Sequence, residues 1–196
     1  MPDETFIYPA EPVLVEYPHP VLRKKAAPVT VFDDALRRFC RQLFAVMELE
    51  KGVGLAAPQV AVSKRIFITE HTRRKGHEGE PDPRVWINPR IEDPDGETVF
   101  EEGCLSFPAI YSKVIRHNRF TAVWQDEFGE ERRQVLDHAA GDFLAIVVQH
   151  ELDHLDGKLF VDYLNDLQFN QIRKRLRELE DAYRKTTGRA GSVIRR

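Results

Sequence analysis

The segment QHELDHLDG, residues 149–157, places two histidines and a glutamate in the pattern His-Glu-x-x-His. Residues four apart on a helix lie one above the other on the same face, so His150 and His154 can turn their imidazoles toward one metal ion. Glu151 is displaced from them by about 100° around the helix axis. The alternative is a pair of core histidines satisfied by hydrogen bonds. Burying Glu151 among apolar residues without a partner would be costly, which favours the metal site.

Two nitrogens do not complete a catalytic metal site, and the third ligand decides the chemistry. In zinc metalloproteases it usually lies downstream, as in HExxHxxGxxH. Here Gly157 matches the glycine of that pattern, but Phe160 occupies the histidine position, and Glu178 and Glu180 lie on a charged helix face. Cys104, upstream in EEGCLSFP, is the better candidate because a thiolate is a strong ligand for a divalent ion. Taken alone, it would equally be a buried structural thiol.

Periodicity predicts the elements that carry these residues. Apolar residues at helical spacing predict an amphipathic helix over residues 33–52, with Cys40 on its buried stripe, and another over 166–185. Residues 139–157 are apolar almost all round, which indicates a buried central helix ending near Gly157. Strands are expected at 65–69, 84–91, 120–126 and 132–136, the last two forming a hairpin. Short strands joined by turns favour antiparallel pairing over βαβ units.

Composition is that of an ordinary globular protein. The 196 residues are 42% hydrophobic and 31% charged, which predicts one domain over residues 1–196. No apolar run approaches the roughly 20 residues that span a bilayer, and we see no secretory signal at the start. With both cysteines expected to be free thiols, a reducing cytoplasm is the predicted location, although one Cys40–Cys104 disulfide is the alternative.

The net charge of −3 is unevenly distributed. Residues 171–196 carry nine Lys/Arg and three Asp/Glu, whereas the rest of the chain carries 20 and 29. A basic end on an acidic body is typical of contact with nucleic acid, which makes the ribosome a candidate partner. We favour the simpler interpretation, a solvated helix face followed by a frayed tail at about 186–196.

Three separated segments resemble, in order, the signature motifs of peptide deformylases: GVGLAAPQ (52–59), EGCLS (102–106) and QHELDHLDG (149–157). The resemblance extends from about residue 13 to residue 160. It implies an α+β fold of antiparallel sheets packed around a central metal-binding helix, here followed by the C-terminal amphipathic helix. It also implies one divalent metal, natively Fe(II) and often replaced by Zn, Ni or Co.

Carried over by motif position, the ligands would be Cys104, His150 and His154. Glu151 would be the general acid and base for removing the N-terminal formyl group from new formylmethionyl polypeptides. The Gln59 side chain and the Leu105 backbone N–H would stabilise the oxyanion. The resemblance and the strand-like approach that small residues allow at GVG predict these substrate-binding residues: Val53, Gly54, Glu102, Gly103, Phe143, Ile146 and Val147.

These assignments have alternatives. GVG is also typical of a turn that ends a helix, and the apolar pocket residues are equally candidates for plain core packing. Many bacterial members of the family carry an arginine where this chain has Tyr111, so preferences beyond methionine are open. A HExxH-type metallopeptidase would lack its third ligand here. A non-catalytic metal module would need a fourth ligand, and His138 is assigned to the turn before the central helix. A monomer is expected.

Overall fold

The computed structural model describes residues 6–73 and 80–194, so part of the polar loop at 71–83 lies outside the described residues. The strands are β1 (Gly54–Ala56), β2 (Ile66–Thr69), β3 (Arg84–Cys104), β4 (Phe107–Gln125) and β5 (Glu131–Asp137). The α-helices are α1 (Asp34–Leu49), α2 (Leu144–Leu155) and α3 (Asp166–Thr187). Short 3₁₀ helices lie at η1 (Pro20–Arg23), η2 (Ala57–Val60), η3 (His71–Arg73), η4 (His138–Ala140) and η5 (Phe160–Tyr163).

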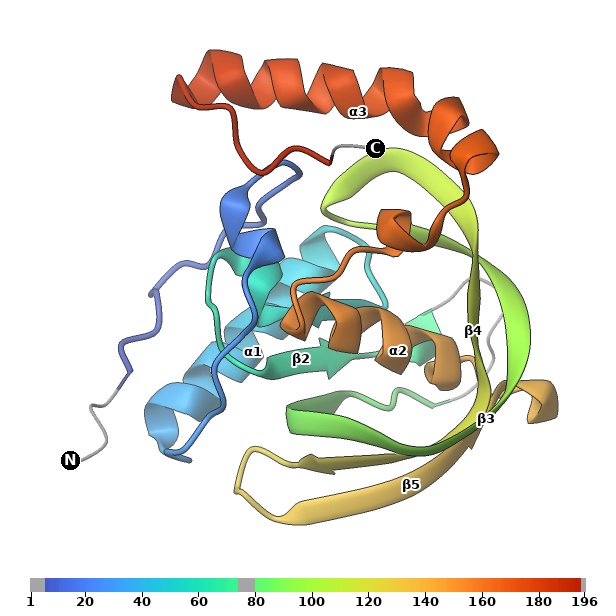
Figure 1. The fold of residues 1–196 in the computed structure, drawn as a ribbon. Coiled ribbons are helices and arrows are strands. Elements are labelled where there is room, and N and C mark those ends of the chain that lie inside the picture. Colours follow the sequence, from blue (N-terminus) through green and yellow to red (C-terminus); the bar gives the residue numbers. More distant parts are fainter. Residues whose placement is uncertain (1–5, 74–79, 195–196) are drawn as a thin grey trace.

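The described strands form one antiparallel sheet in the order β1-β2-β3-β4-β5. Its two longest strands, β3 and β4, bend around α2, which crosses the hollow of the sheet (Figure 1). The predicted α+β class, with antiparallel strands around a central helix, is confirmed. Among the described residues, no helix has both the length and the apolar content needed to span a bilayer.

The strands β3 and β4 are much longer than predicted. The predicted strands covered only residues 84–91 and 120–126, whereas the structure also pairs much of the segments between them. In the structure β3 continues through Asp93 and Gly96, both at positive φ, where its register with β4 shifts. A bulge of this kind bends a strand without ending it. The bend lets the hairpin carry Cys104 back toward α2.

The helices pack as their apolar stripes predict, with one exception. In α1, Cys40 is 3% exposed and lies among the core residues. The α2 residues Leu144, Val148 and Leu155 pack in the core against strand residues that include Trp86 and Phe120. In α3, however, Leu167 in the first turn is 71% exposed, although its spacing from Ile172 and Leu176 fits the apolar stripe. The core contacts at that end come from Phe169 instead, together with Ile172, Leu176 and Leu179.

The segment after α3 turns back onto the start of the chain. Gly188 ends the helix with φ 69°, and Ser192 N–H then donates to Pro18 O at 2.8 Å. The Tyr17 hydroxyl accepts from Ile194 N–H at 2.9 Å and donates to Glu180 at 2.6 Å. The described part of the tail, up to residue 194, is therefore held against the body, where the sequence analysis expected fraying.

The same N-terminal segment reaches two of the signature motifs. Val15 N–H donates to Gln59 O at 2.8 Å, and Tyr17 N–H donates to Ser106 O at 2.9 Å. Residues 15–17 therefore join the GVGLAAPQ segment to the EGCLS segment, side by side, although the two motifs are far apart in sequence. The packing of Tyr17 on Phe107, with ring centroids 5.0 Å apart, reinforces this junction.

Candidate metal centre and substrate cleft

Helix α2 supplies five of the candidate site residues: Ile146, Val147, His150, Glu151 and His154. Its apolar sides bury it in the sheet, so its polar residues face the interior rather than solvent. The helix ends at the C-cap Asp156, and Gly157 follows with φ 70°, as predicted for a C′ glycine. A Cβ at Gly157 would meet Arg23 O at 2.7 Å, so this turn lies directly against η1. The end of the metal-binding motif is thus fixed by close packing.

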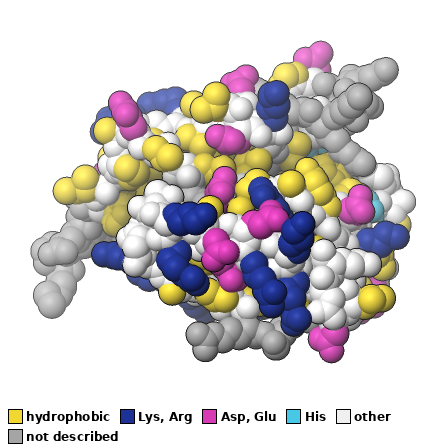
Figure 2. Space-filling model, turned by 90° about the horizontal axis from the view of Figure 1, so that it is seen from above, with side chains coloured by type: hydrophobic (Ala, Val, Ile, Leu, Met, Phe, Trp, Pro, Cys, Tyr) yellow, Lys and Arg dark blue, Asp and Glu magenta, His cyan; other side chains and the backbone are white. Residues whose placement is uncertain are grey.

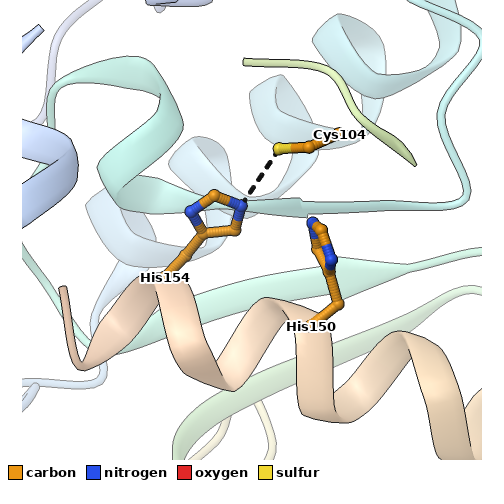
Figure 3. Close-up of side chains that lie close together, drawn as sticks. All are labelled: Cys104, His150 and His154. Atoms are coloured by element: carbon orange, nitrogen blue, oxygen red, sulfur yellow. Dashed lines mark hydrogen bonds between the residues drawn. The ribbon is translucent and has the colours of Figure 1, made fainter. Parts of the chain in front are cut away.

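Cys104 lies at the last position of β3, just before the turn that leads into β4. Its Sγ and one ring nitrogen each of His150 and His154 all lie within 4.8 Å of one another. Figure 3 shows both rings rising from α2 toward the thiol, with Sγ 3.3 Å from His154 Nε2. One thiolate and two imidazoles suit zinc and the later first-row divalent ions. The donor set therefore fits a bound metal, with three protein ligands as in catalytic sites.

A buried ion pair orients His150. Glu102 Oε2 lies 2.8 Å from His150 Nδ1, which leaves Nε2 for a metal. Arg116 donates to both carboxylate oxygens of Glu102, at 2.6 and 2.9 Å. Burial alone would raise the pKa of Glu102, but the hydrogen bonds from Arg116 and His150 lower it to about 2. The carboxylate therefore stays ionised and accepts the His150 Nδ1 proton, an arrangement typical of metal-binding histidines.

This geometry changes the interpretation of Glu102. The sequence analysis assigned it to substrate binding, and the residue does border the cleft described below. Its carboxylate, however, is only 3% exposed as a side chain and is occupied by Arg116 and His150. A peptide in the cleft therefore finds no free carboxylate at this position. Glu102 is better described as a support for His150.

Glu151 is buried beside the ligands without a hydrogen-bond partner for one of its oxygens. The residue is 4% exposed, and among the described residues none forms a hydrogen bond with Oε2. Burial raises the pKa of Glu151 to about 7, so both protonation states are accessible near neutral pH. Gly54 makes room for this carboxylate, because a Cβ there would lie 2.5 Å from Glu151 Oε1. Such a group suits proton transfer.

Gln59 is held with its amide N–H₂ group facing the thiol. Its Oε1 accepts from Ala56 N–H at 2.8 Å, which fixes the amide orientation. Its Nε2 then lies 3.3 Å from Ser106 Oγ and 3.5 Å from Cys104 Sγ. Leu105, the second predicted oxyanion group, lies in the two-residue turn between β3 and β4. The two predicted donors are therefore both placed beside Cys104.

A cleft of about 460 Å³ opens onto this centre. It is bordered by every residue predicted to bind substrate: Val53, Gly54, Glu102, Gly103, Phe143, Ile146 and Val147. The cleft also contacts His150 and Glu151, so the apolar wall and the polar centre belong to one space. Tyr111 stands on its rim, 67% exposed, with its ring against Gly103, where a Cβ would lie 2.5 Å from Cε1.

Three supporting residues were missed by the sequence analysis: Ser106, Arg116 and Asp153. Arg116 carried a detectable signal, because Val114 and Arg116 alternate with exposed residues along β4, so that a charge faces the interior. Asp153 lies inside the signature motif itself, one residue before His154. Ser106 donates to Val15 O at 2.9 Å and gave no signal that would separate it from an ordinary turn serine.

Known proteins match the region of the chain that contains these site residues. The family model described as polypeptide deformylase matches residues 12–170. A peptide deformylase from Wolinella succinogenes is 38% identical over 169 residues, covering 86% of this chain and 97% of its own length. One from Stenotrophomonas maltophilia is 41% identical over 166 residues, covering 83% and 92%.

Solved structures give the same result. A plant peptide deformylase superposes with a TM-score of 0.88 at 33% identity, covering 97% of this chain and 100% of its own. The peptide deformylase of Plasmodium falciparum superposes with a TM-score of 0.82 at 37% identity, covering 89% and 99%. The match in sequence spans all three motifs, and the match in structure spans nearly the whole chain. This chain belongs to the peptide deformylase family.

Proposed function

We infer that this chain is a metal-dependent hydrolase that removes the N-terminal formyl group from formylmethionyl polypeptides. The observation that carries this inference is the group of Cys104, His150 and His154 at a cleft that also contains the buried Glu151. Membership of the family supports the reaction and the use of a metal. We propose that these three residues are the ligands and that residues 1–196 act as one catalytic domain.

The proposed roles follow from where the side chains lie. A divalent ion bound here would lower the pKa of a water ligand. With the ion in place, Glu151, whose pKa is raised to about 7 by burial, would accept a proton from the water as its oxygen bonds to the formyl carbon. It would then return that proton to the leaving amine as the formyl C–N bond breaks. The Gln59 amide and the Leu105 N–H donate to the formyl oxygen as it becomes negative. The apolar wall with Phe143 and Val147 receives the methionine side chain.

The alternative, a HExxH-type metallopeptidase, is not favoured. Phe160, at the position where such enzymes can carry a third histidine ligand, is 2% exposed and packs edge-on against Phe107. Turnover of formyl-Met-Ala-Ser beside an internal peptide of similar length tests the two functions directly. We expect release of formate from the first and an intact second peptide. Cleavage of the internal peptide would favour the peptidase.

The cleft predicts a ranking of substrates. Its inner wall is apolar and unbranched thioethers fill such slots well, so kcat/KM should be highest for formyl-Met peptides and close behind for formyl-norleucine. A missing methylene should cost about 1–3 kcal/mol. Formyl-Asp and formyl-Ala peptides should fall far below. Acetyl-Met should be rejected more sharply, because the extra methyl must fit beside Gln59 and Leu105. Comparable kcat/KM for formyl-Met and formyl-Asp would place the methionine pocket elsewhere.

We propose Fe(II) as the native ion, on the basis of the family resemblance and the mixed thiolate and imidazole donors. Both Fe(II) and a thiolate are sensitive to oxidation, so the activity of the iron form should decay in air. The cobalt and nickel forms should last longer under the same oxygen tension. The measurement is the half-life of activity for each metal form, with anaerobic samples as controls. Equal half-lives would favour zinc as the native ion.

We propose that the exposed basic residues of α3 contact ribosomal RNA near the source of the substrates. Lys174, Arg177 and Lys185 are exposed on this helix. Figure 2, which views the molecule from the side of α3, shows Lys and Arg side chains on this face, interspersed with Asp and Glu. Replacing all three by glutamate should abolish co-sedimentation with ribosomes at moderate salt and leave peptide turnover unchanged.

The matched control for the helix variant is the same charge reversal at Lys24, Lys25 and Lys113, which are exposed outside α3. Equal loss of co-sedimentation in both variants would assign the effect to net charge alone and exclude α3 as the contact. We propose in addition that the chain acts as a monomer in the cytoplasm. The three proposed ligands and Glu151 are supplied by β3 and α2 of a single chain.

A further inference from the structure

A second cavity, separate from the substrate cleft, is bordered by residues that support His150. It encloses about 300 Å³, and its lining includes Arg116, Asp153, Asp156 and Tyr163. The substrate cleft does not include these four residues. Arg116 nevertheless contacts Glu102, which contacts His150. The cavity therefore borders the far end of a chain of side chains that leads to a proposed ligand.

The chain of contacts is continuous and short. The Tyr163 hydroxyl donates to Asp153 Oδ1 at 2.8 Å, and Arg116 donates to Asp153 Oδ2 at 2.5 Å. The same guanidinium donates twice to Glu102 and lies 5.0 Å above the Tyr163 ring. Each oxygen of Asp153 thus has its own donor. The Glu102 and Asp153 carboxylates both bind the Arg116 guanidinium, through different nitrogen atoms.

Burial makes the second carboxylate important. The side chains of Arg116, Glu102 and Asp153 are 4%, 3% and 13% exposed, so their charges interact with little screening by water. Arg116 neutralises one of the two carboxylate charges, so Arg116, Glu102 and Asp153 together keep one net negative charge. With Asp153 uncharged, Arg116 would neutralise Glu102 completely. Glu102 would then be a weaker acceptor for the His150 Nδ1 proton, and His150 a weaker ligand.

We propose that Asp153 is a positioning residue for the metal centre, acting through Arg116 and Glu102 on His150, and that Tyr163 holds it in place. Asp153 acts through Arg116 and not as a ligand, although it directly precedes His154 in sequence. The proposal rests on the ligand set proposed above. It extends that set from the three ligands to a network that ends at the surface of the second cavity.

Helix α2 offers a matched control for Asp153. Asp156 also carries a carboxylate, lines the same cavity and pairs with an arginine, Arg65, at 2.7 Å. No described contact links that pair to Glu102. Asp156→Asn therefore removes the same charge from the same cavity and helix without entering the network. A difference between the two variants isolates the connection to His150 from general effects on stability.

The experiment measures the Co(II) dissociation constant by chelator competition in four forms: the parent chain, Asp153→Asn, Asp156→Asn and Tyr163→Phe. We expect Asp153→Asn to weaken binding about tenfold, the lower end of the usual effect of removing an outer-shell partner. Asp156→Asn should stay within about twofold of the parent on the same argument. The visible absorption bands of the Co(II) form should shift in Asp153→Asn and stay unchanged in Asp156→Asn.

Equal affinities and spectra for Asp153→Asn and Asp156→Asn would overturn the proposal. If Asp153→Asn does not accumulate as folded protein, Tyr163→Phe decides, because it keeps all three buried charges and removes only the hydroxyl that fixes Asp153. A Co(II) affinity of Tyr163→Phe equal to that of the parent would then contradict the proposal. Failure of the parent chain itself to bind Co(II) would instead contradict the proposed metal site.

Discussion

Replacing Glu151 by glutamine is expected to lower kcat/KM for a formyl-Met peptide by about 10²–10⁴-fold while the metal stays bound. The carboxylate borders the same cleft as Cys104 and His150 but is not one of the three grouped donors, and one of its oxygens has no hydrogen-bond partner among the described residues. Glutamine keeps the shape of the side chain and cannot accept a proton. Metal content and kcat/KM are measured on the same preparation.

The pH dependence of kcat/KM provides the control. A general base must be ionised, so kcat/KM of the parent should fall as the pH drops through the pKa of Glu151, which burial raises above its ordinary value. Glu151→Gln should lose this limb of the profile, and Glu151→Asp should retain it at reduced rate. Loss of the metal together with the side chain would mean that Glu151 is a ligand or a structural anchor.

Cys104→Ser and His154→Ala are expected to lose the metal, and with it nearly all turnover. A serine hydroxyl is a poor ligand beside a thiolate, and alanine offers none. The measurement is metal content per chain after dialysis, with formate release as the second readout. Full occupancy in either variant would refute the proposed ligand set.

The second cysteine is the natural control for this experiment. Cys40 is buried in α1 among apolar core residues, and burial raises the pKa of its thiol to about 12, so the thiol stays protonated near neutral pH. Cys40→Ala should therefore keep full metal content and turnover. Comparing Cys104→Ser with Cys40→Ala separates the role of Cys104 from any general effect of losing a cysteine.

Sequence reasoning reached the centre of the site because its signals are local. The four-residue spacing of His150 and His154 fixes their common face once α2 is a helix, and the apolar surroundings identify α2 as buried. Spacing also separated the two cysteines, since Cys40 lies on an apolar helical stripe and Cys104 does not. Choosing Cys104 as the third ligand required the resemblance to a family, because its distance from α2 depends on the fold.

The parts that could not be predicted depend on contacts between distant segments. The strand β3 continues past residue 91 because β4 pairs with it, and no local pattern in that polar stretch encodes the pairing. The partners of the Glu102 carboxylate could not be predicted for the same reason. Its environment is set by Arg116 on the neighbouring strand, and by His150 on a helix nearly fifty residues later. Neither partner is visible from the sequence around residue 102.

The return of the tail to residues 17 and 18 ties the proposed oxyanion groups to a distant part of the fold. Segment 15–17 joins the motifs of Gln59 and Ser106, and Ser192 and Ile194 hold this segment from outside. The alignment of Gln59 beside Cys104 therefore depends in part on contacts made by the segment after α3, although no described residue of that segment borders the cleft.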